Sequence, residues 1–303
     1  MKLYTREQWN TLPRRPRSVA LGFFDGVHWG HREVIRAARR EDAALCVYTF
    51  NTATFTAKGM PPLLCTDTEE AALLEALEVE ELLREDFSVV CHLTPEAFVE
   101  QVLAEELGAV QVTCGFNYRF GAHGAGDAAR LTALCEARGI AVTVVPPVEI
   151  DGITVSSTVL RRLIADGEME TTHRLMGRPF SVCQPVTAGN RIGRRLGLPT
   201  INQPLPEKGV RPRYGVYASY VEVEGVRYPA VTNVGVKPTV GADRPLAETY
   251  ILDYEGDLYG TSPTVFLMSF LRPEATFPSL EALSAQIRQD VTTARERLEI
   301  TRT

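Results

Sequence analysis

The chain has 303 residues, 45% of them hydrophobic and 23% charged, and a formal net charge of −6. This length predicts two domains, and the composition is typical of a globular enzyme. The acidic charge argues against a nucleic-acid binder that relies on a broad basic surface. No apolar run approaches a membrane span, and residues 1–16 lack the apolar core of a signal peptide.

The first half of the chain alternates short apolar runs with helical patterns. The apolar runs predict buried strands at 19–24, 44–50, 87–93, 110–115 and 140–145. The patterns between them predict helices at 31–42, 68–77, 95–107 and 127–138. Strands that alternate with helices form a parallel sheet covered on both faces, with ligands at the carboxyl ends of the strands.

The pattern changes after residue 148. Asp151-Gly152 predicts a hairpin turn, and short helices are expected from Ser156 to Gly167 and at 168–176. We place the domain boundary there, with one domain at 1–176 and a second at 177–303. The second domain is expected to be a small β-barrel with strands at 214–223, 226–234, 248–253 and 264–271, followed by a closing helix at 279–298.

Six cysteines occur in the sequence, and none of them form a C-x-x-C pair or a zinc-binding spacing. Four lie in apolar patterns and are expected to be small buried side chains: Cys46, Cys91, Cys114 and Cys135. Unpaired cysteines are typical of a reducing compartment, so we expect a cytoplasmic protein.

The most informative motif lies between the first predicted strand and helix. It reads Gly22-Phe23-Phe24-Asp25-Gly26-Val27-His28-Trp29-Gly30-His31. Glycines let a phosphate approach the backbone, and a helix N-terminus adds N–H groups and partial positive charge. A lone histidine in such a turn more often only caps the helix. Two histidines with three glycines and an aspartate favour transfer of a nucleotidyl group from a nucleoside triphosphate.

Two further motifs accompany this turn. Gly115-Phe116-Asn117-Tyr118-Arg119-Phe120-Gly121 follows a predicted buried strand, where a glycine-rich loop with an arginine can hold an anionic ligand. Ser156-Ser157-Thr158 begins a predicted helix, and Arg161 follows one turn later. Hydroxyls and an arginine at a helix start can bind phosphate, although a plain helix cap explains the serines equally well.

The second half carries a glycine- and arginine-rich segment, Gly189-Asn190-Arg191-Ile192-Gly193-Arg194-Arg195-Leu196-Gly197-Leu198-Pro199-Thr200-Ile201-Asn202. Its glycines and arginines suit phosphates, and Thr200 and Asn202 offer the hard oxygen ligands that Mg²⁺ shares with ATP phosphates. A basic surface turn is the alternative. Neither a P-loop nor a protein-kinase motif set occurs.

Together, the ordered motifs G-x-F-D-G-V-H-x-G-H, G-x-N-Y-x-F-G and S-S-T-x-L-R resemble the N-terminal module of bacterial bifunctional riboflavin kinase/FAD synthetases. The resemblance covers essentially the whole chain. It implies a Rossmann-like FMN adenylyltransferase domain with a parallel sheet, in which His28 and His31 are catalytic. It also implies an ATP site formed by Gly22, Phe23, Asp25, Gly26, His28, Gly30, His31, Asn117, Ser156, Thr158 and Arg161.

Further motifs accompany this segment in order: Gly177-Arg178-Pro179-Phe180 before it, and after it Asn233-Val234-Gly235, Lys237-Pro238-Thr239 and Glu248-Thr249-Tyr250-Ile251-Leu252-Asp253. Together they resemble the riboflavin kinase domain of the same family, a six-stranded β-barrel. That resemblance implies Glu248 as the base that takes the proton of the ribityl 5′-hydroxyl. It implies Thr200 and Asn202 as Mg²⁺ ligands, and flavin contacts from Asn233, Glu248 and Arg272. The ATP contacts it implies are Gly189, Gly193, Arg194, Thr200 and Asn202.

One segment departs from the family pattern. Where the family has T-F-x-P-H-P, this chain reads Thr49-Phe50-Asn51-Thr52-Ala53-Thr54, and Lys58 is a candidate to replace the absent histidine. We therefore keep two alternatives to a full FMN and FAD synthetase that uses ATP, riboflavin, FMN and Mg²⁺. One is a kinase with a weak or altered adenylyltransferase module, and the other is a flavin-binding regulator without turnover. We expect no nucleic-acid or membrane partner, and a homo-oligomer stays open.

Overall fold

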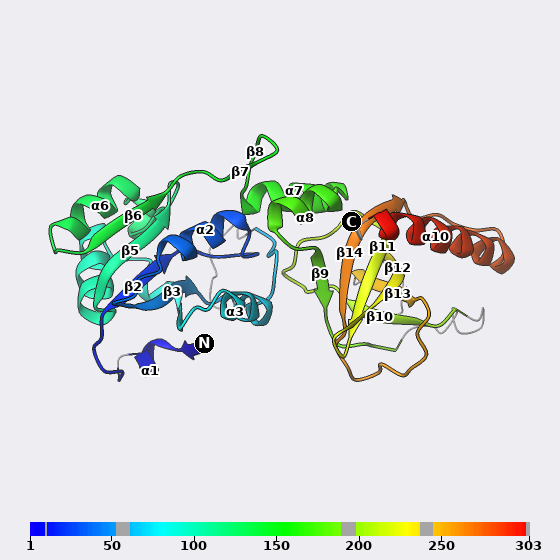
Figure 1. The fold of residues 1–303 in the computed structure, drawn as a ribbon, viewed down its shortest axis with the longest axis horizontal. Coiled ribbons are helices and arrows are strands. Elements are labelled where there is room, and N and C mark those ends of the chain that lie inside the picture. Colours follow the sequence, from blue (N-terminus) through cyan, green and yellow to red (C-terminus); the bar gives the residue numbers. More distant parts are fainter. Residues whose placement is uncertain (10, 53–60, 189–197, 237–244, 301–303) are drawn as a thin grey trace. The chain divides into compact units, whose positions relative to one another are not determined.

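The computed structural model describes the chain except for residues 10, 53–60, 189–197, 237–244 and 301–303 (Figure 1). The chain forms two compact units, Met1–Ser157 and Thr158–Thr303. Each unit has its own six-stranded sheet. None of the helices in the described parts of the chain has the length and apolar character needed to cross a membrane.

The first unit is built on a parallel sheet with the strand order β1-β4-β3-β2-β5-β6. Its strands are β1 (Lys2–Tyr4), β2 (Arg17–Leu21), β3 (Ala44–Phe50), β4 (Glu81–Glu85), β5 (Ala109–Gly115) and β6 (Ala141–Val145). The strands predicted at 44–50, 110–115 and 140–145 are confirmed as β3, β5 and β6. The strand predicted at 19–24 is confirmed as β2 in its first half, but residues 22–24 belong to the turn that follows it. β2 lies between β3 and β5, so its carboxyl end is flanked by theirs.

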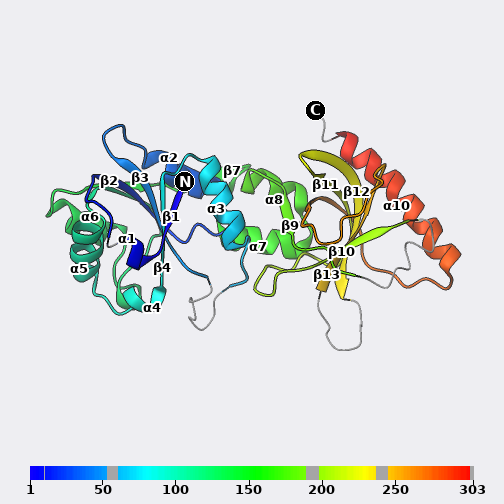
Figure 2. The same cartoon turned by 90° about the horizontal axis from the view of Figure 1, so that it is seen from below.

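Helical segments cover both faces of this sheet (Figure 2). They are α1 (Arg6–Trp9), α2 (Trp29–Ala37), α3 (Asp67–Ala76), α4 (Phe87–Val90), α5 (Pro95–Ala97), η1 (Phe98–Glu106), η2 (Ala122–Gly124) and α6 (Ala128–Glu136). Side chains alternate along a strand, so Val19 and Leu21 join the core beneath η1 and α6, whereas Ala20 joins the core beneath α2 and α3. The sheet is therefore buried on both faces, as predicted.

The strand predicted at 87–93 is wrong. Residues Phe87–Val90 form helix α4, because Asp86 caps it by accepting a hydrogen bond from the Ser88 N–H at 2.9 Å. The neighbouring strand is β4, Glu81–Glu85, whose charged side chains conceal it in the sequence. Glu81 and Glu85 are 3% and 0% exposed, and arginines pair with both. Buried charges are tolerated only when they are paired in this way.

The contribution of the Glu81 ion pair to stability can be tested by mutation. Its carboxylate accepts hydrogen bonds at 2.7 Å from both the Arg17 Nε and the Arg15 Nη2. Glu81→Gln leaves the buried Arg17 cation without its counter-charge, so we expect a loss of about 3 kcal/mol in the free energy of unfolding. Urea unfolding followed by tryptophan fluorescence measures this, because both tryptophans, Trp9 and Trp29, lie in the first unit.

The matched control is Asp42→Asn, which breaks the exposed Arg40–Asp42 pair with its 2.7 Å contact. We expect that change to cost less than about 1 kcal/mol, because solvent screens exposed pairs. Equal losses for the two variants would contradict the role given to burial.

In chain order, the segment from β6 to the second sheet forms a hairpin and two helices, as predicted. The hairpin strands are β7 (Glu149–Ile150) and β8 (Ile153–Thr154), and the helices are α7 (Ser157–Asp166) and α8 (Met169–Met176). Gly177 ends α8 in the left-handed conformation, with φ of 75°, which glycine adopts without strain.

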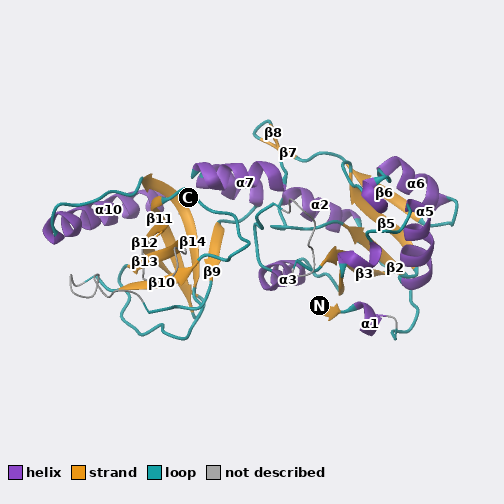
Figure 3. Cartoon of the chain, turned by 180° about the vertical axis from the view of Figure 1, so that it is seen from behind, coloured by secondary structure: helices purple, strands orange, loops and turns teal. Residues whose placement is uncertain are grey.

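The second unit is an antiparallel sheet with the order β10-β13-β12-β11-β14-β9, followed by helix α10 (Leu280–Ile300) (Figure 3). Its strands are β9 (Phe180–Cys183), β10 (Thr200–Pro204), β11 (Gly215–Val223), β12 (Val226–Val236), β13 (Pro245–Ile251) and β14 (Thr264–Arg272). Thr187, just after β9, bridges to Asn202 of β10, so the two ends of the curled sheet approach each other. Ala294 and Leu298 of α10 pack on Val216 and Val231. The predicted small barrel with a closing helix is confirmed.

The cysteines follow the expectation with one exception. Cys46, Cys114 and Cys135 are buried, and burial raises the pKa of the Cys114 thiol to about 11 and of the Cys135 thiol to about 12. Cys91 is exposed, so its predicted burial is wrong. It follows α4 instead of lying in a strand, which accounts for the error. None of the six cysteines, all of which the structure describes, forms a disulfide.

Candidate functional site

The first candidate site is the turn from β2 to α2. Phe24, Gly26 and Val27 have positive φ values of 47°, 84° and 41°, so the chain folds back tightly here. Asp25 is 4% exposed, and its Oδ1 accepts hydrogen bonds from the Leu64 N–H at 2.7 Å and the Cys65 N–H at 3.3 Å. The turn is therefore held in place by hydrogen bonds from the segment that precedes α3.

The two histidines stand together at the start of α2. Their rings stack with centroids 3.6 Å apart and an interplanar angle of 18°. His28 is the N-cap, and its Nδ1 accepts a hydrogen bond from the His31 N–H at 3.3 Å. An accepting Nδ1 places the proton of the neutral His28 ring on Nε2, so that nitrogen is a donor. A Cβ on Gly30 would lie 3.2 Å from His28 Nδ1, so glycine leaves room for this ring.

His28 thus caps the helix, and its ring lies at the helix N-terminus, where backbone N–H groups favour an anion. Its catalytic role stays a prediction. Gly22 and Phe23 begin the same turn, and the Phe23 carbonyl accepts a hydrogen bond from Thr49 Oγ1 at 3.1 Å. The predicted residues of this motif therefore occupy one turn at the carboxyl end of β2.

The serine-rich motif reaches this turn through Ser157, the first residue of α7. Its Oγ donates a hydrogen bond to the Asp25 carbonyl at 3.2 Å. Ser156 precedes the helix, and Thr158 and Arg161 follow Ser157 within it but belong to the second compact unit. The ATP site implied by the family resemblance contains Ser156, Thr158 and Arg161, whereas the hydroxyl that contacts the turn is that of Ser157, which belongs to the same motif.

Asn117 lies in the turn after β5, with an exposed side chain. Beside this turn is a cavity of about 140 Å³ that the sequence analysis missed. Its lining is dominated by aromatic rings, and consists of Phe50, Phe87, Val90, Cys91, Phe98, Tyr118, Arg119, Phe120, Gly121 and Gly124. Burial raises the pKa of the Tyr118 phenol, so its ring is neutral. The cavity suits a flat, apolar ring system at the carboxyl ends of β3 and β5.

The segment that departs from the family pattern is described only at its start. The Asn51 N–H donates to the Glu85 carbonyl at 2.9 Å, and Thr52 Oγ1 donates to Asp67 Oδ1 at 2.8 Å. Thr52 therefore ties the end of β3 to the first turn of α3. Ala53, Thr54 and Lys58 lie outside the described residues, so the suggested replacement by Lys58 stays a prediction.

The second candidate site lies on the face of the second sheet that α10 covers. The strand register places Asn202 opposite Glu248, Glu248 opposite Asn233, and Asn233 opposite Val216. Val216 in turn pairs with Arg272, next to a register shift in β14. Residues directly opposite each other point to the same face, so one row crosses five strands. The row brings four predicted residues together: Asn202, Glu248, Asn233 and Arg272.

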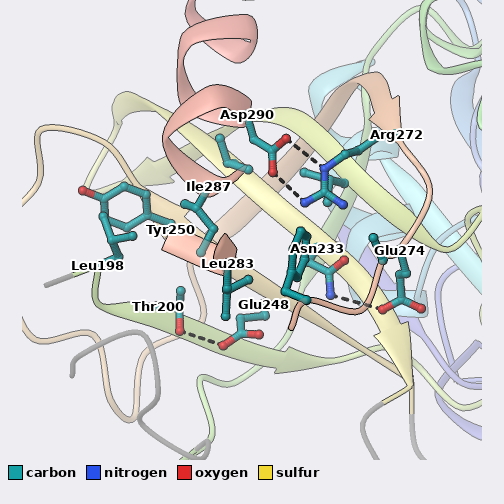
Figure 4. Close-up of a pocket in the computed structure, with 14 residues that line it drawn as sticks. Leu198, Thr200, Asn233, Glu248, Tyr250, Arg272, Glu274, Leu283, Ile287 and Asp290 are labelled. Carbon is teal, nitrogen blue, oxygen red and sulfur yellow. Dashed lines mark hydrogen bonds and ion pairs between the residues drawn. The ribbon is translucent and has the colours of Figure 1, made fainter. Parts of the chain in front are cut away.

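A cavity of about 320 Å³ opens above this row (Figure 4). Thr200 Oγ1 donates to Glu248 Oε1 at 3.0 Å, and Asn233 Nδ2 donates to Glu274 Oε1 at 3.3 Å. Arg272 lies beside Asp290 of α10. The lining is Leu198, Thr200, Val216, Val231, Asn233, Glu248, Tyr250, Arg272, Glu274, Ala275, Phe277, Leu283, Ile287 and Asp290. The α10 residues and Phe277 were missed, because nothing local in the sequence marks a helix as the wall of a distant strand's cavity.

A second, smaller cavity of about 60 Å³ also borders Thr200. Its lining combines aliphatic and tyrosine side chains: Val186, Pro199, Thr200, Ile201, Ile251, Tyr254, Gly256, Asp257, Leu258 and Tyr259. Thr200 therefore stands between a larger cavity that holds a carboxylate and a smaller one with aromatic walls. Gly189, Gly193 and Arg194 lie outside the described residues.

The donors around Thr200 fit a magnesium ion that is held jointly with phosphates. Thr200, Asn202 and Glu248 supply hydroxyl, amide and carboxylate oxygens, and Mg²⁺ takes its remaining ligands from nucleotide phosphates and water. Within the described ranges no group of three or more His, Cys, Asp and Glu side chains could hold a metal alone. The donor set is therefore compatible with a metal ion that also takes ligands from nucleotide phosphates.

Comparison with known proteins assigns both units. A family model described as FAD synthetase matches residues 12–159, and one described as riboflavin kinase matches residues 176–298. A bifunctional riboflavin kinase/FMN adenylyltransferase of Pseudomonas fluorescens is 35% identical, covering 94% of this chain and 94% of its own length. The protein of that name from Escherichia coli strain K12 is 33% identical, covering 94% of this chain and 93% of its own.

A solved structure supports the fold. The crystal structure of a macrolide-efflux protein from Streptococcus pneumoniae matches with a TM-score of 0.86 and 30% sequence identity, covering 97% of this chain and 98% of its own. The function in that name differs from the one that the curated relatives carry. The match therefore supports the architecture of the chain, and the sequence relatives support its chemistry.

Proposed function

The chain belongs to the family of bifunctional riboflavin kinase/FMN adenylyltransferases, and on that basis we propose that it converts riboflavin to FMN and then FMN to FAD, with ATP in both steps. The observation that carries the proposal is that each unit has a separate site of the matching chemistry. The first has paired histidines at a helix N-terminus. The second has a carboxylate beside a hydroxyl in a cavity of about 320 Å³.

In the second unit, Glu248 is the base of the kinase reaction. The ribityl 5′-oxygen attacks the γ-phosphorus of ATP, its proton passes to Glu248, and ADP leaves. Thr200 donates to Glu248 Oε1 at 3.0 Å, which fixes the carboxylate in the cavity. Thr200 and Asn202 would hold Mg²⁺, which supplies positive charge against the phosphate oxygens.

The two cavities around Thr200 suggest how the substrates lie. We assign riboflavin to the larger one, with its ribityl end at Glu248 and its ring toward Arg272 and α10. We assign the nucleoside part of ATP to the smaller one, where Tyr254 and Tyr259 offer aromatic surfaces to a base. The shared residue Thr200 then lies where the γ-phosphate meets the hydroxyl.

In the first unit, the reaction needs no protein nucleophile. A phosphate oxygen of FMN attacks the α-phosphorus of ATP, and pyrophosphate leaves. His28 and His31 donate hydrogen bonds to the phosphoryl oxygens, whose charge grows in the transition state. We assign the flavin ring of FMN to the aromatic cavity at the ends of β3 and β5.

Incubation of the purified chain with riboflavin, ATP and Mg²⁺ tests the proposal, with FMN and FAD separated by chromatography. We expect FMN to appear first and FAD to follow, and EDTA to abolish both. FMN without FAD would reduce the chain to a kinase with an inactive second module. Riboflavin binding without ATP consumption would instead favour a flavin-binding regulator.

We propose two further assignments. The family-model matches end at residue 159 and begin again at 176, and we keep the functional boundary after Met176. We also propose a cytoplasmic enzyme whose partners are its small-molecule substrates, in keeping with its six cysteines outside disulfides.

A further inference from the structure

The ring end of the larger cavity is closed by an ion pair between Arg272 and Asp290. Arg272 Nε donates to Asp290 Oδ1 at 2.9 Å, and Arg272 Nη2 donates to Asp290 Oδ2 at 2.7 Å (Figure 4). This two-bond geometry matches the planar guanidinium to the planar carboxylate, which fixes orientation as well as distance. Asp290 is 5% exposed, so solvent screens the pair weakly.

The same carboxylate is held by its own helix. Gln286 Nε2, one turn earlier on α10, donates to Asp290 Oδ1 at 3.0 Å. Arg272 is fixed on its other side, because Nη1 donates to the Pro273 carbonyl at 3.0 Å. Both partners therefore have one orientation, although one is on a strand and the other on a helix.

The remaining donors of Arg272 define what this end of the cavity can bind. A guanidinium has five N–H groups, and the bonds described above use three of them, which leaves one on each Nη among the described contacts. The positive charge is balanced by Asp290, and two more carboxylates, Glu248 and Glu274, line the cavity. Such a site disfavours an anion and favours a neutral hydrogen-bond acceptor.

The position of Arg272 suits the far end of riboflavin. Arg272 is three strands away from Glu248 in the row across the sheet, or about 14 Å along its curve. With the reacting hydroxyl at Glu248, the ring lies toward Arg272. The pyrimidine part of the ring carries neutral carbonyl oxygens, which are acceptors for N–H groups.

We propose that Asp290 is a positioning residue for riboflavin: it orients the Arg272 guanidinium and cancels its charge, so that Arg272 donates to the carbonyl edge of the flavin ring. The proposal rests on the proposed riboflavin kinase function. Asp290 does not touch the reacting atoms, so it acts on binding of the ring and not on the chemical step.

The test uses the full-length chain with Asp290→Asn, which keeps the size of the side chain and removes its charge. We expect the KM for riboflavin to rise about tenfold, equivalent to about 1.4 kcal/mol. The KM for ATP and kcat should stay within about twofold. The Kd of lumiflavin, the ring without a ribityl chain, should rise by the same factor in a fluorescence titration. Asp290→Glu should recover part of the loss.

The matched control is Arg295→Gln on the same helix. Arg295 Nη2 contacts Asp253 Oδ1 and Oδ2 at 3.0 and 2.7 Å, and neither residue lines the cavity. If Asp290 only anchored α10, both variants would raise both KM values and lower kcat together, and this result would overturn the proposal. Unchanged riboflavin and lumiflavin binding in Asp290→Asn would overturn it as well.

A second variant and a binding measurement cover the cases in which Asp290→Asn does not fold or the chain forms no FMN. If Asp290→Asn does not fold, Arg272→Lys keeps the positive charge but loses the planar fork, and the same rise is expected. If the unmodified chain forms no FMN, the proposed function fails, while lumiflavin binding still decides the role of Asp290.

Discussion

Replacing Glu248 by glutamine is expected to slow FMN formation by about 10² to 10⁴-fold, the usual contribution of a general base. Glutamine can still accept a hydrogen bond from Thr200 Oγ1, now 3.0 Å from Glu248 Oε1, but it cannot take the proton of the attacking hydroxyl. The loss should therefore appear in kcat more than in the KM for riboflavin. Initial rates of FMN formation, measured by chromatography at saturating ATP and Mg²⁺, give both constants.

The chain carries its own control for this experiment. Conversion of supplied FMN to FAD uses the first unit, so Glu248→Gln should leave that rate unchanged. Glu296→Gln, an exposed position on α10, should leave both rates unchanged. A Glu248→Gln enzyme that forms FMN at more than about a tenth of the normal rate would remove Glu248 from the role of base.

Substitution of either histidine in the β2–α2 turn is expected to give the opposite result. Loss of one donor to the developing phosphoryl charge costs about 10² to 10³-fold, so FAD formation from FMN should fall by that factor. Riboflavin phosphorylation should be unaffected. The rate of FAD formation with FMN and ATP supplied directly measures the effect without any contribution from the kinase.

The variants are chosen to separate catalysis from folding. His28 also caps α2, so truncation to alanine would cost about 1 kcal/mol of stability in addition to the donor. His28→Asn keeps a good capping side chain and removes the ring, and His31→Ala removes the second ring. Normal unfolding by tryptophan fluorescence together with slow FAD formation would support the proposal, whereas normal FAD formation would contradict it.

A strand can be predicted from the sequence when its own side chains are apolar, but not when its buried polar side chains are paired with residues far away in the chain. β3 is recoverable because its apolar side chains are themselves the signal. β4 is not, because Glu81 and Glu85 are buried by pairing with arginines that lie more than sixty residues away. β10 was not predicted either, because its polar residues also conceal a buried strand. Gln203 is fully buried, and its Nε2 donates to the carbonyls of Gln184 and Pro263 at 2.6 and 2.8 Å.

The two candidate sites also differ in how far they can be predicted from the sequence. The turn around His28 and His31 is a local motif, so its residues could be selected before the structure was known. The alignment of Asn202, Glu248 and Asn233 depends on strand pairing between distant segments. Asn202 could be selected from its own motif, whereas only the family resemblance pointed to Glu248 and Asn233. Nothing in the sequence pointed to Asp290, because the role proposed for it depends on its contact with Arg272, eighteen residues earlier in the chain.

The pairing of β13 with both of its neighbours has a practical consequence. Side chains alternate between the two faces of a strand, so a slip of one residue would turn Glu248 away from the cavity and bring Ala247 or Thr249 into its place. Such a slip would also separate Glu248 from Asn202 and Asn233 at once. With the proposed role of Glu248, the specific rate of riboflavin phosphorylation should fall in proportion to the fraction of molecules whose strands are mispaired, so this rate is a functional measure of native strand alignment.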